Sequence, residues 1–400
     1  MALVRSALNI RLDPTPEQAD VLAGFAGARR WVWNWALQRR KETYEKDGKA
    51  ISWSELSKEL TALKREPETE WLAEVDSQAL QQGMRDLKAA FAAFFRGDAG
   101  YPRWRSKKRH SPTFRIPQRV RLNESTVYVP KIGNVEVRHV PPGVDGSTKG
   151  ATFKRSAAGN WYVKLVVEWH CEEGPVNLPA DPDQVVGVDL GLTTYAVLSD
   201  GGKVENPRFS REGDRKLRKL HRELSRKKRG SRNRAKARKR LACAYEKIGN
   251  QRKDFAHKLT TGLLDRFEGV CIEDLGVSAL ARTKLARSVL DAAWGEIKRQ
   301  LAYKAPRRGK YLGFAGRFEA TTKVCHVCQN RVPELKLSDR SWRCGECGTD
   351  HDRDENAAAM VKQLGWGRYA SGTQDVAAGL VETENARGPT VRPATAGSLG

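Results

Sequence analysis

The sequence predicts an α+β protein of several domains, and three observations lead to this class. Apolar residues recur at helical spacing between residues 15 and 97, whereas apolar and polar residues alternate in short segments between 101 and 173. Beyond residue 184, two buried strand-like runs each end in an acid, and a C-x2-C pair recurs after fifteen residues. For a chain of 400 residues, about two or three domains are usual.

The charge balance indicates a polyanionic partner. The chain has 72 Lys and Arg against 48 Asp and Glu, a formal charge of +24. Such an excess repels itself and favours binding to nucleic acid. The N-terminal segment MALVRSALNIRLDP lacks the apolar stretch of a signal peptide, and no charge-free run is long enough to span a membrane. We therefore expect a cytoplasmic protein with no membrane partner.

The first hundred residues predict one strand and three helices. Residues 4–12 alternate as a half-buried strand does, and Thr15, Pro16 and Gln18 then supply an N-cap, a first-turn proline and a capping-box partner. Two more apolar stripes at helical spacing follow before Gly97. These stripes are Leu56, Leu60 and Leu63, and Leu80, Met84, Leu87, Phe91 and Phe94. Their apolar faces predict a packed helical core.

Short alternating segments between residues 101 and 173 predict an antiparallel, barrel-like β region. Its first stretch, YPRWRSKKRH, mixes aromatic rings with cations, a combination that can stack bases and follow phosphates. A solvated charged loop is the alternative interpretation. The proline-bearing segment 174–184 is typical of a linker.

The next region opens with two strands and a strongly basic segment. VVGVDLG is typical of a buried strand, and TYAVLSD of its hairpin partner, which turns at residues 200–202. Residues 211–240 contain sixteen Lys and Arg against three acids, a net charge of +13, with leucines still at helical spacing. We expect helices here that bind phosphates in a salt-dependent way, with a disordered basic segment as the alternative.

The remaining patterns alternate between helix and strand. Helical spacing over 255–263 and 290–301 predicts two amphipathic helices, and GVCIED between them is a second buried strand that ends in acid. Residues 310–320 are expected to be extended, and the HDRDENAAA segment opens a short helix. The tail has little to bury, so residues 367–400 are expected to be disordered.

Four of the seven cysteines have the spacing of a two-knuckle zinc site. They are Cys325, Cys328, Cys344 and Cys347. A disulfide interpretation is weaker because nothing indicates secretion. His326 and His351 flank the site, but four thiolates already complete a tetrahedron, so neither is assigned as a ligand. Cys171, Cys243 and Cys271 are expected to be reduced, buried residues.

Three acids, Asp189, Glu273 and Asp354, are candidate ligands for catalytic metal ions. Singly, each has an ordinary explanation: Asp189 begins a turn, Glu273 caps the next segment, or Asp354 is the N-cap of its own helix. Together the three acids suggest one site, because two of them lie at the ends of buried strands, where an isolated carboxylate loses solvation. Mg²⁺ is hard and binds carboxylates together with phosphate oxygens.

RuvC nucleases belong to the RNase H-like fold, and the order of elements here is the layout of that fold. A strand that ends in an acid is followed by a hairpin and an insertion, then by a second strand that ends in an acid, a second insertion and a helix with the third acid. With GVDLG, IEDL, HDRDENAA and the zinc ribbon between the last two, the chain closely resembles the TnpB (OrfB) family of transposon-encoded, RNA-guided DNA nucleases. The likeness extends from the N-terminal strand to about residue 365. By motif match, Asp354 is chosen over Asp352 as the third acid.

The resemblance implies five parts. They are a wedge domain over 1–14 and 98–180, a helical recognition lobe over 15–97, a RuvC-like nuclease domain over 181–320 and 350–366, a zinc ribbon over 321–349, and the tail over 367–400. Asp189, Glu273 and Asp354 would be the catalytic acids.

The resemblance also implies the cofactors and partners. The acids would hold two Mg²⁺ ions for phosphodiester hydrolysis, with one structural Zn²⁺ on the cysteines. The expected partners are a guide RNA from the transposon end and double-stranded target DNA beside a short flanking motif, bound by a monomer near the prokaryotic nucleoid. No individual Lys or Arg is assigned as a nucleic-acid contact. The alternatives are a transposase, or a zinc-ribbon DNA-binding protein or guided repressor without cleavage.

Overall fold

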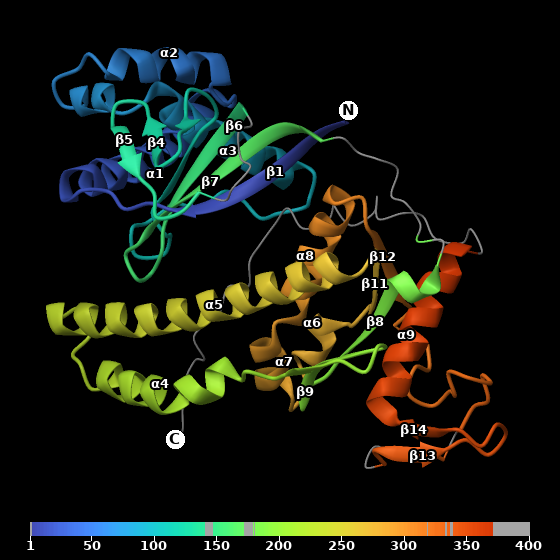
Figure 1. Ribbon diagram of the computed structural model, residues 1–400. Helices are drawn as coiled ribbons and strands as arrows, with labels where there is room; N and C mark the ends of the chain where they lie inside the picture. The colour runs from blue at the N-terminus through green and yellow to red at the C-terminus, as the bar shows by residue number, and fades with distance from the viewer. Residues whose placement is uncertain are drawn as a thin grey trace. The chain divides into compact units, whose positions relative to one another are not determined.

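The computed structural model describes residues 2–140, 147–171, 179, 181–317, 319–332, 334–336 and 339–370. The chain divides into two compact units (Figure 1). Unit 1 comprises Met1–Glu172 and Arg218–Glu246, and unit 2 comprises Glu173–Leu217 and Lys247–Gly400. The units divide between residues 172 and 173, whereas the expected domain boundary lies between 180 and 181. The basic segment was expected to belong wholly to the nuclease domain, whereas residues 218–246 group with unit 1.

Unit 1 contains two antiparallel sheets. The larger has the order β1-β7-β6-β2, and the smaller has the order β3-β4-β5. The strands are β1 (Ala2–Arg11), β2 (Thr113–Ile116), β3 (Arg121–Leu122), β4 (Thr126–Val129), β5 (Gly133–Glu136), β6 (Ser147–Arg155) and β7 (Trp161–Cys171). A single bridge between Leu12 and Val137 connects the sheets. The described strands therefore form two open sheets, so the barrel-like expectation holds only in part.

The helices of unit 1 follow the predicted apolar stripes. They are α1 (Pro16–Asp47), α2 (Trp53–Leu63), η1 (Glu70–Glu74) and α3 (Ser77–Phe95). Thr15 and Gln18 form the predicted capping box at the start of α1. Helix α1 approaches α3 closely at Gly83, where an added Cβ would lie 2.9 Å from the Arg29 carbonyl oxygen. Arg29 also donates hydrogen bonds to Asp86 and to the Thr113 carbonyl, so one side chain ties α1 to α3 and β2.

Unit 2 is built on a five-stranded mixed sheet with the order β10-β9-β8-β11-β12. The strands are β8 (Val185–Leu190), β9 (Thr194–Leu198), β10 (Lys203–Glu205), β11 (Gly269–Glu273) and β12 (Tyr311–Ala315). Strand β8 pairs antiparallel with β9, and β11 lies parallel to both β8 and β12. The turn η2 (Pro182–Gln184) precedes β8.

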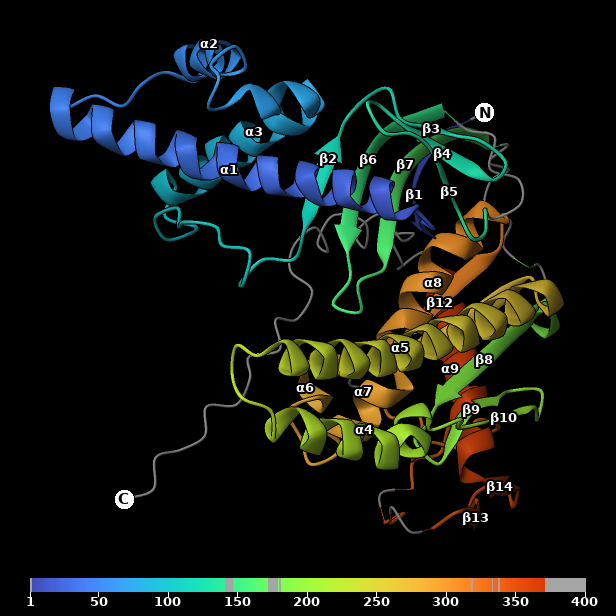
Figure 2. The same cartoon turned by 90° about the vertical axis from the view of Figure 1, so that its left-hand side faces the viewer.

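Helices pack on both faces of this sheet. The helices in this part of the chain are α4 (Phe209–Ser225), α5 (Arg232–Arg266), α6 (Val277–Leu280), α7 (Ala286–Ala292), α8 (Trp294–Arg307) and α9 (Arg353–Ala370), of which α4 and α5 also contribute residues 218–246 to unit 1. One face packs on buried residues of α5, α7 and α8, and the other packs on α9 (Figures 1 and 2). Alternate residues of β8 and β11 therefore point to opposite layers.

Helix α9 reaches the sheet because β8 has a glycine at the contact. A Cβ added to Gly187 would lie 2.0 Å from the Ala358 carbonyl oxygen and 2.6 Å from the Lys362 nitrogen. Farther along, a Cβ at Gly313 would lie 2.7 Å from the Gly365 carbonyl oxygen. These backbone approaches leave no room for a side chain, so they determine how α9 lies on the strands.

Three predicted boundaries are corrected by the structure. Residues 290–301 were expected to form one helix, but Ala293 has a positive φ of 53° and separates α7 from α8, which leaves Leu290 57% exposed. The small sheet of β13 (Ser341–Arg343) and β14 (Asp350–Asp352) extends past the expected ribbon end at 349. Helix α9 runs to Ala370, so 367–370 are helical, and the rest of the predicted tail lies outside the described residues.

Among the described residues, none of the helices combines the length and apolar character needed to cross a membrane.

Candidate functional site

Two of the predicted acids lie at the same edge of the unit 2 sheet. Asp189 is near the end of β8, and Glu273 is the last residue of β11. The parallel register pairs Gly187 with Cys271, so Asp189 and Glu273 follow two residues later on neighbouring strands. Because side chains alternate along a strand, both acids point to the face that carries α9.

Helix α9 brings the third acid to this edge. Ala358 lies over Gly187, and Val361 packs in the same cluster as Val185, so the helix runs antiparallel to β8. Asp354 lies one helical turn before Ala358, about 5–6 Å farther along. Two residues of strand cover about 6.6 Å, so Asp354 lies near the level of Asp189.

The structure also decides which aspartate caps α9. The Asp352 carboxylate accepts hydrogen bonds from the backbone nitrogens of Asp354 and Glu355, at 2.9 and 3.0 Å. Asp352 is therefore the N-cap residue, and the interpretation of Asp354 as the cap is wrong. The Asp354 carboxylate is left for another role, as the motif match predicts.

The three carboxylates influence one another electrostatically. The pKa of Asp189 is raised to about 7, first by loss of solvation at the end of β8 and then by the negative charges of Glu273 and Asp354. The buried Arg353 guanidinium partly opposes this shift. Within the described residues, no hydrogen-bond donor to the Asp189 side chain is found. A cation between the acids would relieve both the repulsion and the lost solvation.

The raised pKa gives a prediction for stability in a chelator. Between the unfolded pKa of about 3.9 and the folded value of about 7, folded Asp189 binds more protons than unfolded Asp189. The free energy of unfolding therefore falls as pH rises through this window, by at most about 4 kcal/mol. We expect Asp189→Asn to stabilise the metal-free protein at pH 8 and to change little at pH 4, measured by urea unfolding at both values.

The neighbouring Asp274 provides the control for this experiment. Its carboxylate binds Lys298 at 2.5 Å and Arg317 at 3.1 Å, and the hydrogen bond from Lys298 holds its pKa below the usual range. Asp274→Asn should therefore destabilise the protein at pH 8, the opposite sign. Wild type that is at least as stable as Asp189→Asn at pH 8 would contradict the prediction.

The other two acids have neutral or cationic neighbours. The Thr321 hydroxyl donates to Glu273 at 2.7 Å, and Arg340 forms an ion pair with Asp354 at 3.4 Å. Among described residues, only the four cysteines place three or more ligand atoms within 4.8 Å of one another, so the carboxylates are spaced more widely. The site therefore offers hard oxygen ligands at one sheet edge, which is the donor set that fits Mg²⁺.

The four cysteines meet, and their spacing fits zinc. The sulfur atoms of Cys325 and Cys347 are 3.7 Å apart, and those of Cys328 and Cys344 are 3.5 Å apart. Tetrahedral zinc with bonds of about 2.3 Å requires sulfur atoms about 3.8 Å apart, whereas a disulfide requires about 2.05 Å. The disulfide alternative is therefore excluded for these pairs in this structure. Cys325, Cys328, Cys344 and Cys347 would hold the zinc.

The histidines beside the cysteines have supporting roles. Buried His351 places Nε2 3.1 Å from the Cys325 sulfur, so an N–H donor can stabilise a thiolate there. His326 contacts Asn356, with its backbone nitrogen and Nδ1 each 3.0 Å from the Asn356 Oδ1. Leaving both histidines outside the four-sulfur set agrees with the geometry.

Sequence reasoning missed the residues that connect the segment of the four cysteines to the acids. Asn356 is 1% exposed, and its amide also donates to the Val324 carbonyl at 2.8 Å. It lies two residues after Asp354, inside the HDRDENAAA motif, which was the available signal. Thr321 precedes the first cysteine and touches Glu273, but no local pattern marks it.

Family models match three parts of the chain. OrfB_IS605, described as "Probable transposase", matches residues 168–284, and "Cas12f1-like, TNB domain" matches 294–361. A model described as "Helix-turn-helix domain" matches 1–49. In the described part of that range, residues 2–49 form β1 and the single helix α1, with no helix-turn-helix.

Curated relatives match over nearly the whole chain. A "Putative RNA-guided DNA endonuclease" from Streptomyces pristinaespiralis is 36% identical over 378 residues, covering 93% of this chain and 92% of the relative. The chain belongs to the TnpB (OrfB) family. A further TnpB-family relative, "Putative RNA-guided DNA endonuclease InsQ" from Escherichia coli (strain K12), is 34% identical and covers 92% of this chain and 94% of its own length. The resemblance predicted from the motifs is confirmed.

Solved structures show a weaker likeness to this TnpB-family chain. A cryo-EM structure of a Cas12f1-sgRNA-target DNA complex has a TM-score of 0.46 and 12% identity, covering 90% of this chain and 99% of the other. At this level the likeness supports no conclusion about function.

Proposed function

We propose that this protein is an RNA-guided DNA endonuclease that hydrolyses phosphodiester bonds at Asp189, Glu273 and Asp354. The observation that carries the proposal is the convergence of these acids from β8, β11 and α9, together with the raised pKa of Asp189. Relatives that cover more than nine-tenths of the chain are named RNA-guided DNA endonucleases, which supports guided DNA as the substrate.

The nuclease domain would be RuvC-like, with an RNase H-like fold. The strand order β10-β9-β8-β11-β12, antiparallel at β8-β9 and parallel at β11, supports this assignment. In chain order, β8 is the first strand of this sheet and carries Asp189, and β11 is the fourth and carries Glu273. Helix α9, which packs on the sheet, carries Asp354.

The residues of the site would act by charge and position. Mg²⁺, when bound, would supply a Lewis acid and an activated water for phosphodiester hydrolysis. Asp189 lies on the central strand, interacts electrostatically with both other acids and would hold the metal together with Glu273 and Asp354. Thr321 would orient the Glu273 carboxylate through its 2.7 Å hydrogen bond. Arg340 would restrain Asp354 until substrate and metal compete for it.

The decisive experiment is guided cleavage of a plasmid library with randomised sequence beside the target, in Mg²⁺. The protein is co-expressed with RNA from its own transposon end, and Asp189→Asn is assayed in parallel. Guide-matched double-strand breaks by wild type alone, at a restricted set of flanking sequences, are the expected result. Cleavage that ignores the guide, or that persists in Asp189→Asn, would overturn the proposal.

A guided DNA-binding protein without cleavage is the second candidate, and the transposase description of the matching family model is the third. All three acids are present and electrostatically coupled, which favours the nuclease. Equal guided binding by wild type and Asp189→Asn, with no breaks in either, would instead identify a repressor. Joined transposon ends would identify a transposase.

The ribbon contact of Asn356 predicts a further effect on cleavage. Asn356→Ala removes the bonds to His326 and Val324 two residues from Asp354, so we expect cleavage to fall about 10- to 100-fold while zinc stays bound. Hydrogen exchange at the His326 amide should become faster. The measurements are single-turnover cleavage, zinc content and amide exchange.

Gln363 supplies the matched control. It lies on the same helix as Asn356 and donates to the His326 carbonyl at 2.7 Å. It is about two turns farther from Asp354 than Asn356 is. Gln363→Ala should change cleavage by less than threefold, roughly the value of one exposed hydrogen bond. If both variants lose activity equally, Asn356 does not act by positioning Asp354.

A further inference from the structure

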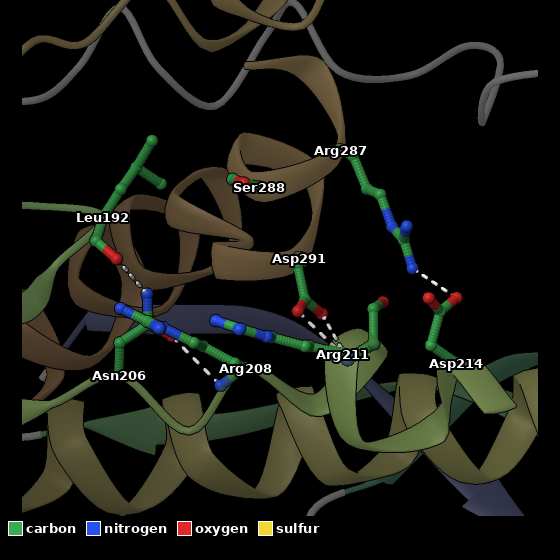
Figure 3. Close-up of a pocket in the computed structure, with 9 residues that line it drawn as sticks. Leu192, Asn206, Arg208, Arg211, Asp214, Arg287, Ser288 and Asp291 are labelled. Atoms are coloured by element: carbon green, nitrogen blue, oxygen red, sulfur yellow. Dashed lines mark hydrogen bonds and ion pairs between the residues drawn. The ribbon is translucent and has the colours of Figure 1, made fainter.

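A pocket of about 400 Å³ lies in unit 2 beside the end of the first catalytic strand (Figure 3). Leu192, just beyond β8, lines it together with the segment that joins β10 to α4 and with residues of α7. Neither the sequence motifs nor the proposed roles of the acids use this pocket. Its polar lining is dominated by Arg208, Arg211 and Arg287.

The pocket walls are held by contacts between distant segments. The Asn206 side chain donates to the Leu192 carbonyl at 2.8 Å and accepts from the Arg208 backbone nitrogen at 3.1 Å. Asp291 on α7 accepts from the Ser210 backbone nitrogen at 3.0 Å, which fastens the start of α4. These bonds join chain segments up to 81 residues apart, so the pocket is a product of tertiary packing.

The charges in the pocket leave two cations without a local partner. Asp291 pairs with Arg252 at 2.6 Å, and Asp214 pairs with Arg287. In contrast, neither Arg208 nor Arg211 has an ion pair or side-chain hydrogen bond within the described residues. Figure 3 shows their two side chains extending into the same space. Both side chains are exposed and line the same pocket, so one anion bound there would interact favourably with both charges.

The backbone supports a specific role for Arg208. Its φ is +46°, a left-handed conformation that glycine and asparagine adopt more readily than arginine. An arginine in this conformation has a conformational cost, which the surrounding contacts offset, among them the Asn206 bond to the Arg208 nitrogen. A guanidinium also presents a planar fork that matches two phosphate oxygens.

We propose that Arg208 and Arg211 form a phosphate subsite for the strand that is cut. This inference rests on the proposed nuclease function. Leu192 follows Asp189 by three residues, so their Cα atoms are at most about 11 Å apart. Leu192 lines the same pocket as Arg208 and Arg211, so the subsite would take a phosphate a few nucleotides from the scissile bond on the same strand.

The test combines protein variants with single neutral linkages in the DNA. The guide-RNA complex of Arg208→Gln/Arg211→Gln is compared with wild type on targets in which one phosphate near the cut is a methylphosphonate. Arg215→Gln/Lys216→Gln is the control, because these cations lie one turn farther along α4 and are exposed, as Arg208 and Arg211 are, but do not line the pocket. Single-turnover cleavage is measured in Mg²⁺, and target binding is measured in chelator at several salt concentrations.

We expect one linkage at which the neutral phosphate slows wild type about tenfold, the value of a charge-assisted hydrogen bond, and slows the double variant less than twofold. The control pair should respond as wild type does. With the neutral phosphate at that linkage, the slope of the log binding constant against the log salt concentration should become shallower by about 0.7 for wild type only. Equal penalties in wild type and the double variant, or the same loss in the control pair, would overturn the subsite.

The two proposals fail separately in this experiment. Guided cleavage by wild type with equal linkage penalties overturns the subsite and leaves the nuclease intact. No cleavage by wild type overturns the nuclease proposal, and a linkage-specific loss of binding that the double variant lacks would then identify a DNA phosphate site that serves binding alone. Inorganic phosphate that competes as strongly as an equal concentration of oligonucleotide would identify a free-anion site and overturn the strand assignment.

Discussion

Glu273→Gln is expected to reduce guided cleavage by at least about 1000-fold, whereas Asp274→Asn, one residue later, should leave it within about threefold of wild type. Both changes replace a carboxylate with its amide and keep the side-chain length. Glu273 ends β11 beside Asp189 and contributes to its raised pKa, so it belongs to the cluster that would bind metal. Single-turnover cleavage in saturating Mg²⁺ measures the effect.

Asp274 is the informative control because its partners differ. Its carboxylate already binds Lys298 and Arg317, and its pKa is held low by the hydrogen bond from Lys298. Asp274→Asn should therefore lower stability without removing a metal ligand. Guided DNA binding should survive both changes. Equal loss of cleavage in the two variants would contradict the assignment of Glu273 as a ligand.

The second large effect is expected from Cys344→Ser. Cys344 is 1% exposed, and its sulfur lies 3.5 Å from that of Cys328. A structural zinc site contributes on the order of 10 kcal/mol to the folding of its module, so removal of one thiolate should release the metal and unfold the ribbon. Because the ribbon contacts the acids through Asn356 and Thr321, cleavage should fall by at least about 100-fold.

Zinc content is measured by elemental mass spectrometry, and guided cleavage is measured alongside it. Wild type should carry one zinc per chain, and Cys344→Ser should carry none. Cys243→Ser is the control and should keep both zinc and activity. Cys243 lies on α5, outside the four-cysteine cluster, and its thiol is exposed, so the expectation that it is buried is wrong. Full cleavage by a zinc-free Cys344→Ser protein would show that the ribbon does not support the acids.

Much of this organisation could be predicted because it depends on residues that are close in the chain. The capping box of Thr15 and Gln18, the buried strands β8 and β11, and the knuckle spacing are all local patterns, and the structure confirms them. The break at Ala293 could not be predicted in the same way. The apolar spacing continues across it, and only packing selects the left-handed residue that ends α7.

The sequence by itself selected the residues that we propose carry the chemistry: Asp189, Glu273, Asp354 and the four spaced cysteines. Residue type and spacing single out the cysteines as candidate zinc ligands, and the strand-end and helix-start motifs single out the acids. Tertiary structure alone decided that Asp352 is the cap while Asp354 lies by the acids, and that Arg208 and Arg211 line one pocket. Those outcomes depend on the packing of α9 against Gly187 and of α7 against α4, contacts between segments that are far apart in sequence.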